Sequence, residues 1–469
     1  MRQVFKFLPA EDTQAGGFTN QAAIVIVAYM LAIFIVGIWR HRSKGLVDFH
    51  LAGRSQGIGA LTGTFCATIL GASSTIGMAG LGYSRGLAGS WWMLSGTIGM
   101  LILSVFLAEK VRSTGCSTLP QLVGSFWGEK ARASASILIA ISWIGVIAVQ
   151  IIASGNILFA LFGGDITHYM IISSMIFVLY TAYGGKVSVI RTDIFQLLII
   201  ICGLIILCRE ALEIAGPGPL AGQSFPLSAE MDFWEVISLI LVVGSAYLIG
   251  PDMYSHIFSS RSAREAKISA FISAIILIPL AFLITTLGIF SRHLYPGISP
   301  EQAIPTLMTG LLSPPIEGLV AAALLAAFMS SADTCLMTAT SILTFDIYGE
   351  MRRRMHGESD PRTSQDHLMK ISRAAVIIAG ASALILAVSV PDIIKTLLLA
   401  YTIFTSGLLM PIIAGFYRKQ LGLTTAGALW AIAAGGSTAI LLGQSYPLLG
   451  MAVSAVLLFA VSWWERRHL

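Results

Sequence analysis

Small and hydroxyl-bearing residues recur at steps of three and four along one very apolar stretch of the chain, residues 321–344. They are Ala327, Ser330, Thr334, Thr338 and Ser341, with Ser331 and Asp333 beside them. Such steps follow the helical period, so these side chains share one face of a helix. Lipid cannot satisfy a polar face, which must therefore meet protein, water or an ion. Its oxygens suit the coordination of a small cation such as sodium.

The composition is that of a polytopic membrane protein. Of 469 residues, 56% are hydrophobic and 11% are charged, whereas soluble chains carry about 25% charged residues. We expect one all-helical membrane domain over residues 1–469, with a first apolar run long enough to span rather than be removed as a signal peptide. The net charge of +5 is explained by its placement and indicates no nucleic-acid partner. Five cysteines without a CxxC pair indicate free thiols rather than a zinc or iron–sulfur site.

Thirteen apolar runs are long enough to cross a bilayer, which takes about 20 residues. They cover residues 20–40, 59–82, 88–109, 134–162, 166–183, 190–208, 236–257, 268–291, 318–346, 371–390, 395–416, 422–442 and 447–464. With the N-terminus outside and the C-terminus inside, 23 of the 29 Lys and Arg fall on the inner side. Basic residues favour the cytoplasm, so the asymmetry supports the count, this orientation and a cell-membrane location.

One long polar loop, residues 349–372, carries a cluster of arginines between two of these runs. We expect an ordinary cytoplasmic connector that follows the positive-inside rule. The alternative is that its arginines contact anionic membrane lipid.

Two of the runs are interrupted near their middle. The second loses its bulky apolar residues at 71–75, and the seventh contains Gly250-Pro251. Proline removes a helix hydrogen bond, and breaks at matching points of two halves mark a transporter binding site. The alternative is a simple kink at Gly250-Pro251 and a close helix contact at Gly71.

The two interrupted runs are five runs apart, which predicts two five-helix repeats of opposite topology. The first repeat covers residues 59–208 and the second covers residues 236–416. One N-terminal helix, residues 20–40, and two C-terminal helices, residues 422–464, lie outside them.

Oxygens for a sodium ion are available where the second run breaks. The carbonyls of Ala67 and Leu70 lie just before the break, where the helix can free them. The Ala327 carbonyl and the Ser330 and Ser331 hydroxyls lie on the polar stripe. The alternative is that the paired hydroxyls bond their own helix backbone.

Several segments together resemble the sodium:solute symporter family. The stretch YGGKVSVIRTDIFQ, from Tyr183 to Gln196, resembles the family signature that enters the sixth span, and Ala327-Phe-Met-Ser-Ser-Ala-Asp-Thr resembles its sodium-binding helix. Gly250-Pro-Asp-Met-Tyr-Ser and Leu399-Ala-Tyr-Thr-Ile-Phe resemble further family segments. The resemblance implies a LeuT-like inverted-repeat fold and sodium-driven symport. It places the family's sodium site on Ala67, Leu70, Ala327, Ser330 and Ser331.

The same resemblance assigns Asp193 to the family's acidic residue on the inner side of the ion path. Lys186 departs from the motif, which usually has a bulky apolar residue there. We expect its side chain to snorkel to the cytoplasmic face and to leave the ion site undisturbed.

Asp333 and Thr334 lie one turn inward of Ser330, on the side from which Asp193 can approach. Our hypothesis is a second cation site formed by Asp193, Ser330, Asp333 and Thr334. Two close carboxylates cannot both stay charged and unpaired, so a cation or a proton should lie between them. The alternative is that Asp333 caps or pairs elsewhere.

The solute should bind beside the two breaks, on the outer side of the ion. The stronger candidate contacts are Ser73, Ser74, Thr75, Asp252 and Tyr254, and the weaker ones are Gln150, Thr402 and Thr405. Hydroxyls and an amide suit a small polar organic solute, and Asp252 could pair with a cationic or hydroxyl-rich one.

The sequence therefore predicts a sodium-coupled symporter that imports a small polar solute by alternating access. The alternatives are a proton-coupled or uncoupled carrier on the same fold, a membrane sensor, or an intramembrane enzyme that uses Asp193 and Asp333 as an acid pair. The flanks of those aspartates lack the glycine-bearing motif of such an enzyme, so we expect no enzymatic activity.

Overall fold

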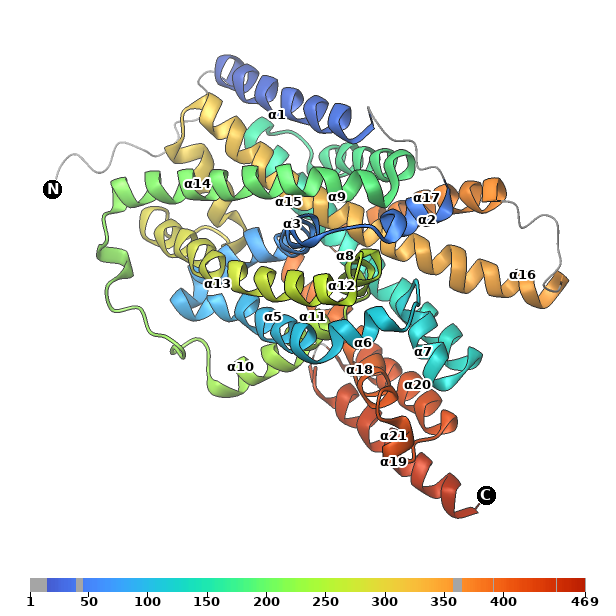
Figure 1. Cartoon of the computed structure of the whole chain (residues 1–469). Coiled ribbons are helices and arrows are strands. Elements are labelled where there is room, and N and C mark those ends of the chain that lie inside the picture. The colour runs from blue at the N-terminus through green and yellow to red at the C-terminus, as the bar shows by residue number, and fades with distance from the viewer. Residues whose placement is uncertain (1–14, 39–44, 357–364, 391, 444, 469) are drawn as a thin grey trace.

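The computed structural model describes residues 15–38, 45–356, 365–390, 392–443 and 445–468, and these are helical almost throughout (Figure 1). The helices of the first half are α1 (Ala15–Ile38), α2 (Leu46–Leu51), α3 (Ile58–Ile69), α4 (Met78–Arg85), α5 (Trp91–Ile102), α6 (Ala108–Ser113), α7 (Leu119–Trp127), α8 (Glu129–Phe162) and α9 (Ile166–Ala215). Those of the second half are α10 (Phe233–Leu239), α11 (Ser245–Ile249), α12 (Pro251–Ser259), α13 (Ala263–Leu294), α14 (Ala303–Leu311), α15 (Pro314–Ser341), α16 (Gly349–His356), α17 (Gln365–Ser389), α18 (Ile393–Gly415), α19 (Arg418–Leu421), α20 (Thr425–Leu442) and α21 (Leu449–His468).

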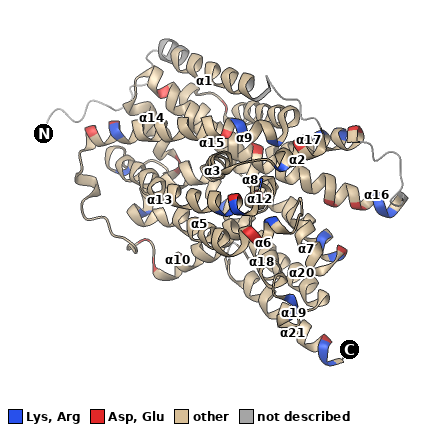
Figure 2. Cartoon of the chain, viewed as in Figure 1, with Lys and Arg blue, Asp and Glu red and all other residues tan. Residues whose placement is uncertain are grey.

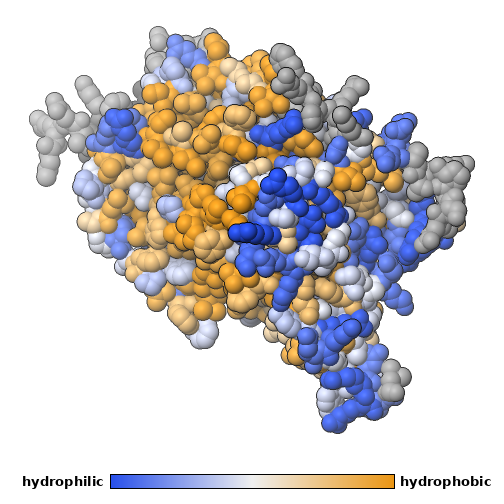
Figure 3. Space-filling model, viewed as in Figure 1, coloured by the Kyte–Doolittle hydropathy of each residue, from blue (hydrophilic) through white to orange (hydrophobic). Residues whose placement is uncertain are grey.

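The surface of this bundle is one that lipid, not water, would satisfy. In the described part of the chain nine helices are long and apolar enough to cross a membrane, and two shorter apolar helices accompany them. Large apolar side chains point outward from these helices, with Ile385 70% exposed and Leu441 79% exposed. Figure 2 shows long stretches of helix without charge, and Figure 3 shows hydrophobic residues over the left and centre of one face. The predicted all-α membrane class is therefore confirmed.

Each of the thirteen predicted runs overlaps helical residues in the described part of the chain. The fifth and sixth runs are joined in α9, which Gly185 interrupts with φ 63° and ψ −172°. The end of the second run and the third run are joined over Ser73–Ser113, with Gly86 at φ 66° between them. Glycine adopts such positive φ values without the steric cost that a Cβ brings. The number of thirteen crossings stays a prediction.

Helix α15, which carries the polar stripe, lies in the middle of the bundle (Figure 1). It packs against α1, α8, α9 and α17, and every residue from 320 to 341 is buried. Small residues allow the close approach of α9, because a Cβ on Gly203 would lie only 2.7 Å from the Cβ of Ala323. The polar stripe therefore faces protein on every side rather than lipid.

Both predicted interruptions are present. Helix α3 ends at Ile69, and a π-helical turn, Ser73–Gly77, leads into α4. Helix α11 ends at Ile249 and α12 begins at Pro251, because Gly250 between them has φ −53° and ψ 129°, outside the helical range. Residues from both breaks line one small cavity.

The prediction of a loop over residues 349–372 is wrong at both ends. Its first residues form α16, and its last residues belong to α17. Glu350 pairs with Arg353 at 3.0 Å and with Arg354 at 2.8 Å, at the three- and four-residue spacing that stabilises a helix. The part between the two helices, residues 357–364, lies outside the described residues.

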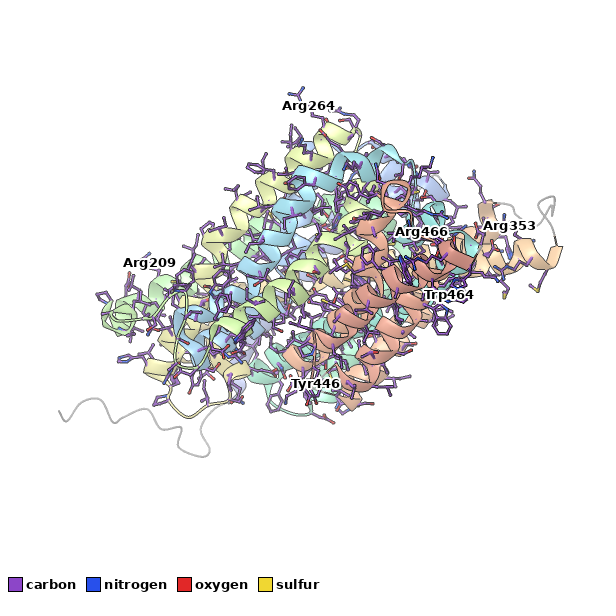
Figure 4. The ribbon with its side chains drawn as sticks, turned by 90° about the horizontal axis from the view of Figure 1, so that it is seen from below. Arg209, Arg264, Arg353, Tyr446, Trp464 and Arg466 are labelled. Carbon is purple, nitrogen blue, oxygen red and sulfur yellow. The ribbon has the colours of Figure 1, made fainter. Side chains whose placement is uncertain are left out.

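Residues that the sequence places on opposite sides of the membrane lie toward different sides of the bundle. In Figure 4, Arg264, Arg353 and Arg466 lie toward the upper and right-hand sides, whereas Arg209 and Tyr446 lie toward the left and lower sides. The sequence assigns the first three to inner loops and Arg209 to the outer side. The grouping is compatible with one membrane axis along the bundle, and the direction of that axis stays a prediction.

The short helix α2 contacts two long helices, α15 and α17, through His50. His50 is buried, its Nδ1 lies 2.8 Å from Ser341 Oγ on α15, and its Nε2 lies 2.9 Å from Ser372 Oγ on α17. The rings of Phe49 and Phe345 pack against the His50 ring. Burial in these surroundings lowers the pKa of His50 to about 3.

We expect this histidine to make the protein less stable in acid. The folded pKa lies below the ordinary value of about 6.5, so the unfolded chain binds more protons between these values. The stabilisation is complete above pH 6.5 and is lost progressively as the pH falls toward 3. At pH 5 the loss should be about 2 kcal/mol. The measurement is the difference in melting temperature between pH 7.5 and pH 5, which should shrink in His50→Gln; an equal difference in both proteins would contradict the prediction.

Candidate functional site

The break after α3 frees backbone groups that side chains from two other helices then bind. The Ala72 N–H, which would continue the helix to Thr68, donates instead to Gln150 Oε1 on α8 at 2.9 Å. The Thr68 carbonyl accepts from the Ser331 hydroxyl at 2.6 Å. The Ala67 carbonyl accepts from the Ser330 hydroxyl at 2.8 Å. The unwound turn is therefore held between α8 and α15 by hydrogen bonds rather than by its own helix.

Three of the five predicted sodium ligands come together at one point. The Ser330 hydroxyl lies 2.8 Å from the Ala67 carbonyl and 3.1 Å from the Ala327 carbonyl, and all three residues are fully buried. The Ala67 carbonyl lies near the end of α3, where the break frees it, whereas the Ala327 carbonyl lies within the continuous helix α15. Carbonyl and hydroxyl oxygens gathered in this way are what a sodium ion needs.

The other two predicted ligands, Ser331 and Leu70, do not contact these three oxygens in the same way. Ser331 bonds the Thr68 carbonyl, a residue that the sequence analysis did not single out. Leu70 is buried at the end of α3, with φ −75° and ψ 43°, and no hydrogen bond of the described residues joins its carbonyl to either serine. The alternative of hydroxyls bonding their own helix holds only in part, because Ser330 bonds both its own helix and α3.

The four residues of the hypothetical second cation site have separate partners. Thr64 donates to Asp193, and Thr181 donates to Asp333 Oδ1 at 2.7 Å. Thr334 accepts from the Thr68 hydroxyl at 3.2 Å. The two carboxylates are close enough to interact electrostatically, and each keeps one oxygen without a hydrogen-bond partner in the described part of the chain.

The prediction that Lys186 snorkels to the surface is wrong. Its side chain is completely buried, and it interacts electrostatically with Asp193 and Asp252. Phe49 of α2 covers the start of this half of α9, because a Cβ on Gly185 would lie 2.7 Å from the Phe49 ring. The lysine therefore belongs to the buried polar region beside the ion path.

The predicted solute contacts divide into those that reach the cavity and those that do not. Ser73, Gln150 and Asp252 line the cavity, whose volume is about 20 Å³. Asp252 Oδ1 also accepts from the Met253 N–H at 2.9 Å, in the first turn of α12. Predicted contacts that do not line it are Ser74, Thr75, Tyr254, Thr402 and Thr405.

Four of these residues have other contacts or lie elsewhere in the bundle. The Thr75 hydroxyl donates to the Gly71 carbonyl at 2.8 Å, and the Thr405 hydroxyl donates to the Tyr401 carbonyl at 2.7 Å. Thr402 lines a larger cavity of about 420 Å³ next to Lys395 and Glu235. Tyr254 is fully buried.

Several lining residues were not predicted from the sequence. They are Tyr401 and Leu397 of α18, Cys335 of α15 and Val146 of α8. Tyr401 lies inside the segment LAYTIF that carries the family resemblance, which was the available signal. The others are apolar or weakly polar and carried no sign of a binding role.

Gly71 is where α8, α15 and the break approach most closely. A Cβ there would lie 2.5 Å from Ser331 Oγ and 2.8 Å from Gln150 Oε1. We therefore expect Gly71→Ala to push both side chains away, to cost about 1–3 kcal/mol of stability and to remove most of the stabilisation that sodium gives. Melting temperatures with and without sodium measure both effects. Gly59→Ala is the control, because nothing lies within 4 Å of its added Cβ; equal behaviour of the two variants would contradict this geometry.

Known proteins resemble this chain over most of its length. The model of the sodium:solute symporter family matches residues 49–224 and 296–435. A sodium/glucose cotransporter of Vibrio parahaemolyticus is 25% identical over 406 residues, which cover 76% of this chain and 73% of that protein. A sodium/proline symporter of Staphylococcus aureus is 24% identical over 443 residues, which cover 90% of this chain and 85% of that protein.

Solved structures share the fold. A Na+-coupled sialic acid symporter in a substrate-bound outward-open state has a TM-score of 0.79 at 18% identity, covering 96% of this chain and 98% of that one. A nucleobase-cation-symport-1 family transporter, closed with bromovinylhydantoin bound, has a TM-score of 0.63 at 13% identity. The LeuT-like fold that the family resemblance implies is thereby confirmed. Because the family model matches more than half of the chain, including the interrupted α3–α4 segment and the serine pair of α15, the protein belongs to the sodium:solute symporter family and is a sodium-coupled symporter.

Proposed function

We propose that this symporter binds its coupling sodium ion between the α3 break and α15. The ligands are the carbonyls of Ala67, Leu70 and Ala327 and the hydroxyls of Ser330 and Ser331. The observation that carries the proposal is the Ser330 hydroxyl, which lies within hydrogen-bond distance of two buried carbonyls from different helices. A sodium ion at this point would replace those hydrogen bonds and join α3 to α15. The Thr68 carbonyl, which contacts Ser331, is a further oxygen for the shell.

The proposed solute is a small polar organic molecule that binds between the two breaks. Ser73, Gln150 and Asp252 are the proposed direct contacts, because they line the cavity there. Its volume of about 20 Å³ is too small for such a molecule, so the site must open before the solute enters. The proposed further contacts, which would have to move toward the solute in that opening, are Ser74, Thr75, Tyr254 and Thr402. The names of two relatives, a sodium/glucose cotransporter and a sodium/proline symporter, match this class of solute.

The proposed cycle is alternating access between the two five-helix repeats, residues 59–208 and 236–416. Sodium joins the broken segment to α15 and favours the form that is open to the outside. The solute then binds, the site turns inward and sodium leaves past Asp193. A ligand can shift this balance only through its different affinities for the two forms.

The proposed orientation places the N-terminus outside and the C-terminus in the cytoplasm of the cell membrane, so that transport is import. The exposed apolar side chains of the long helices are the proposed contacts with membrane lipid. No nucleic acid takes part in this proposal.

Asp193, Ser330, Asp333 and Thr334 form the proposed inner cation position. This position requires positive charge because the carboxylates of Asp193 and Asp333 interact electrostatically in a buried region. If that charge is a second sodium ion, the sodium dependence of uptake should be cooperative, and Asp333→Ala should remove the cooperativity.

A thermal-shift screen of small polar solutes, with and without sodium, tests the proposed function. A true solute stabilises the folded protein, and it should do so more strongly when sodium is present, because both ligands favour the same form. Choline chloride at equal ionic strength replaces sodium in the control. If stabilisation by the solute is the same in choline, or if it follows the proton concentration instead, the proton-coupled or uncoupled alternative holds.

A further inference from the structure

Lys186 is a buried positive charge that the proposed sodium cycle does not use. The side chain is 0% exposed, and its Nζ has no hydrogen-bond partner among the described residues. An ammonium group in such surroundings requires negative charge nearby, because it has lost its hydration. Packing of the side chain alone therefore does not explain why a charged group is buried here.

Two buried carboxyl groups, one of them at the inner end of the ion path, can supply negative charge to Lys186. Asp193 and Asp252 are the two carboxyl groups that interact electrostatically with Lys186. Lys186 and Asp193 are seven residues apart on the second half of α9, so both lie on one helix face two turns from each other. Asp193 Oδ1 has no hydrogen-bond partner among the described residues.

The fold prevents the ammonium group from escaping to water. Gly185 breaks α9 with φ 63° directly before the lysine. Phe49, which is 1% exposed, packs over this point. The four-carbon stem therefore enters the bundle, and the charge is tethered to α9 beside the ion path.

The oxygens that a second sodium ion would need at this position each make a hydrogen bond with a different group. Thr64 donates to Asp193, Thr181 donates to Asp333, and the Ser330 hydroxyl faces the Ala67 carbonyl. None of these contacts brings the two carboxylates and the hydroxyls to one common point. A tethered ammonium group needs no such convergence, since it only has to lie near one carboxylate.

We propose that Lys186 supplies the positive charge of the inner cation position, so that this symporter binds a single sodium ion instead of two. This rests on the proposed main sodium site. The lysine charge stays with the protein through the cycle, whereas a second sodium ion would be carried across. Removing the lysine charge should open the position beside Asp193 to a second sodium ion.

Equilibrium binding of radioactive sodium to the purified full-length protein in detergent tests this inference. We expect about one sodium ion per chain in the wild type and in Lys186→Arg, which keeps the charge. We expect about two in Lys186→Met, which keeps the length of the side chain without its charge. The double variant Lys186→Met with Asp193→Asn should return to about one, because the carboxylate that would hold the second ion is gone.

The outcomes separate the inference from the proposed function. Two sodium ions in the wild type, or one in a folded Lys186→Met protein, would overturn the role of Lys186 and leave the main site intact. No sodium binding in the wild type would instead overturn the proposed function. Lys186→Gln, which keeps a polar end, replaces Lys186→Met if gel filtration shows that the methionine variant does not fold. If neither variant folds, the wild-type stoichiometry alone decides.

Discussion

Replacing Ser330 and Ser331 together by alanine is expected to weaken sodium-dependent stabilisation strongly and to abolish sodium-driven uptake at the sodium concentrations that suffice for the wild type. Each hydroxyl lies against a carbonyl freed by the α3 break, at 2.8 Å and 2.6 Å respectively. Losing one such buried partner costs about 1–2 kcal/mol, which corresponds to roughly a tenfold change in affinity. The double variant should therefore raise the sodium concentration for half-maximal effect by about 100-fold. Melting temperatures over a sodium titration measure this concentration.

Thr338→Ala is the matched control for the serine pair. Thr338 lies on the same buried helix, and its hydroxyl donates to the Thr334 carbonyl of that helix at 2.8 Å. It loses a buried hydroxyl without touching the α3 break, so its sodium dependence should stay within about twofold of the wild type. An equal loss of sodium affinity in Thr338→Ala would mean that α15 responds to any lost hydroxyl, and the serine assignment would be wrong.

The second large effect is expected from Asp252→Asn, which should remove solute binding and spare sodium binding. The asparagine oxygen can still accept from the Met253 N–H, which Asp252 binds at 2.9 Å, so the hydrogen bond in the first turn of α12 remains. Only the negative charge at the cavity is lost. A hydrogen bond to a charged group contributes about 1.5–3 kcal/mol, so the solute affinity should fall by at least about tenfold.

The measurement for Asp252→Asn is stabilisation by the solute that the screen identifies, followed by stabilisation by sodium alone. Ser291→Ala is the control, because its buried hydroxyl has no hydrogen-bond partner among the described residues and does not line the cavity. Unchanged solute affinity in Asp252→Asn would remove this carboxylate from the solute site. Loss of the sodium effect in the same variant would show that the substitution disturbs the break itself.

Local patterns in the sequence were sufficient to predict the long apolar helices and the interruptions near Gly71 and at Gly250-Pro251. Gly250-Pro251 cannot continue a helix, because proline lacks the N–H and clashes with the preceding turn. The periodicity of the α15 stripe placed Ser330 on the polar face of that helix. Ala67, Ala327 and Ser330 meet as the motif implied. The helices and their interruptions depend on residues close together in sequence, so spacing revealed them. The meeting of Ala67 with Ser330 spans 263 residues, and it followed from the family resemblance.

Features that depend on packing between distant segments could not be predicted in this way. Hydropathy favours a snorkelling Lys186, and only the position of Phe49 over Gly185 explains its burial. His50 joins two helices that follow it by 291 and 322 residues, and no local signal marks such a contact. The helix α16 depends on ion pairs within a segment whose charge suggested a loop.

Solute accumulation in proteoliposomes tests the central claim, that sodium bound at the α3–α15 junction drives transport. With an inward sodium gradient, the wild-type protein should concentrate the identified solute above its external level, and Ser330→Ala with Ser331→Ala should only equilibrate it or fail to take it up. A proton gradient in choline should produce no accumulation. Accumulation driven by protons without sodium, or undiminished accumulation by the double variant, would contradict the account.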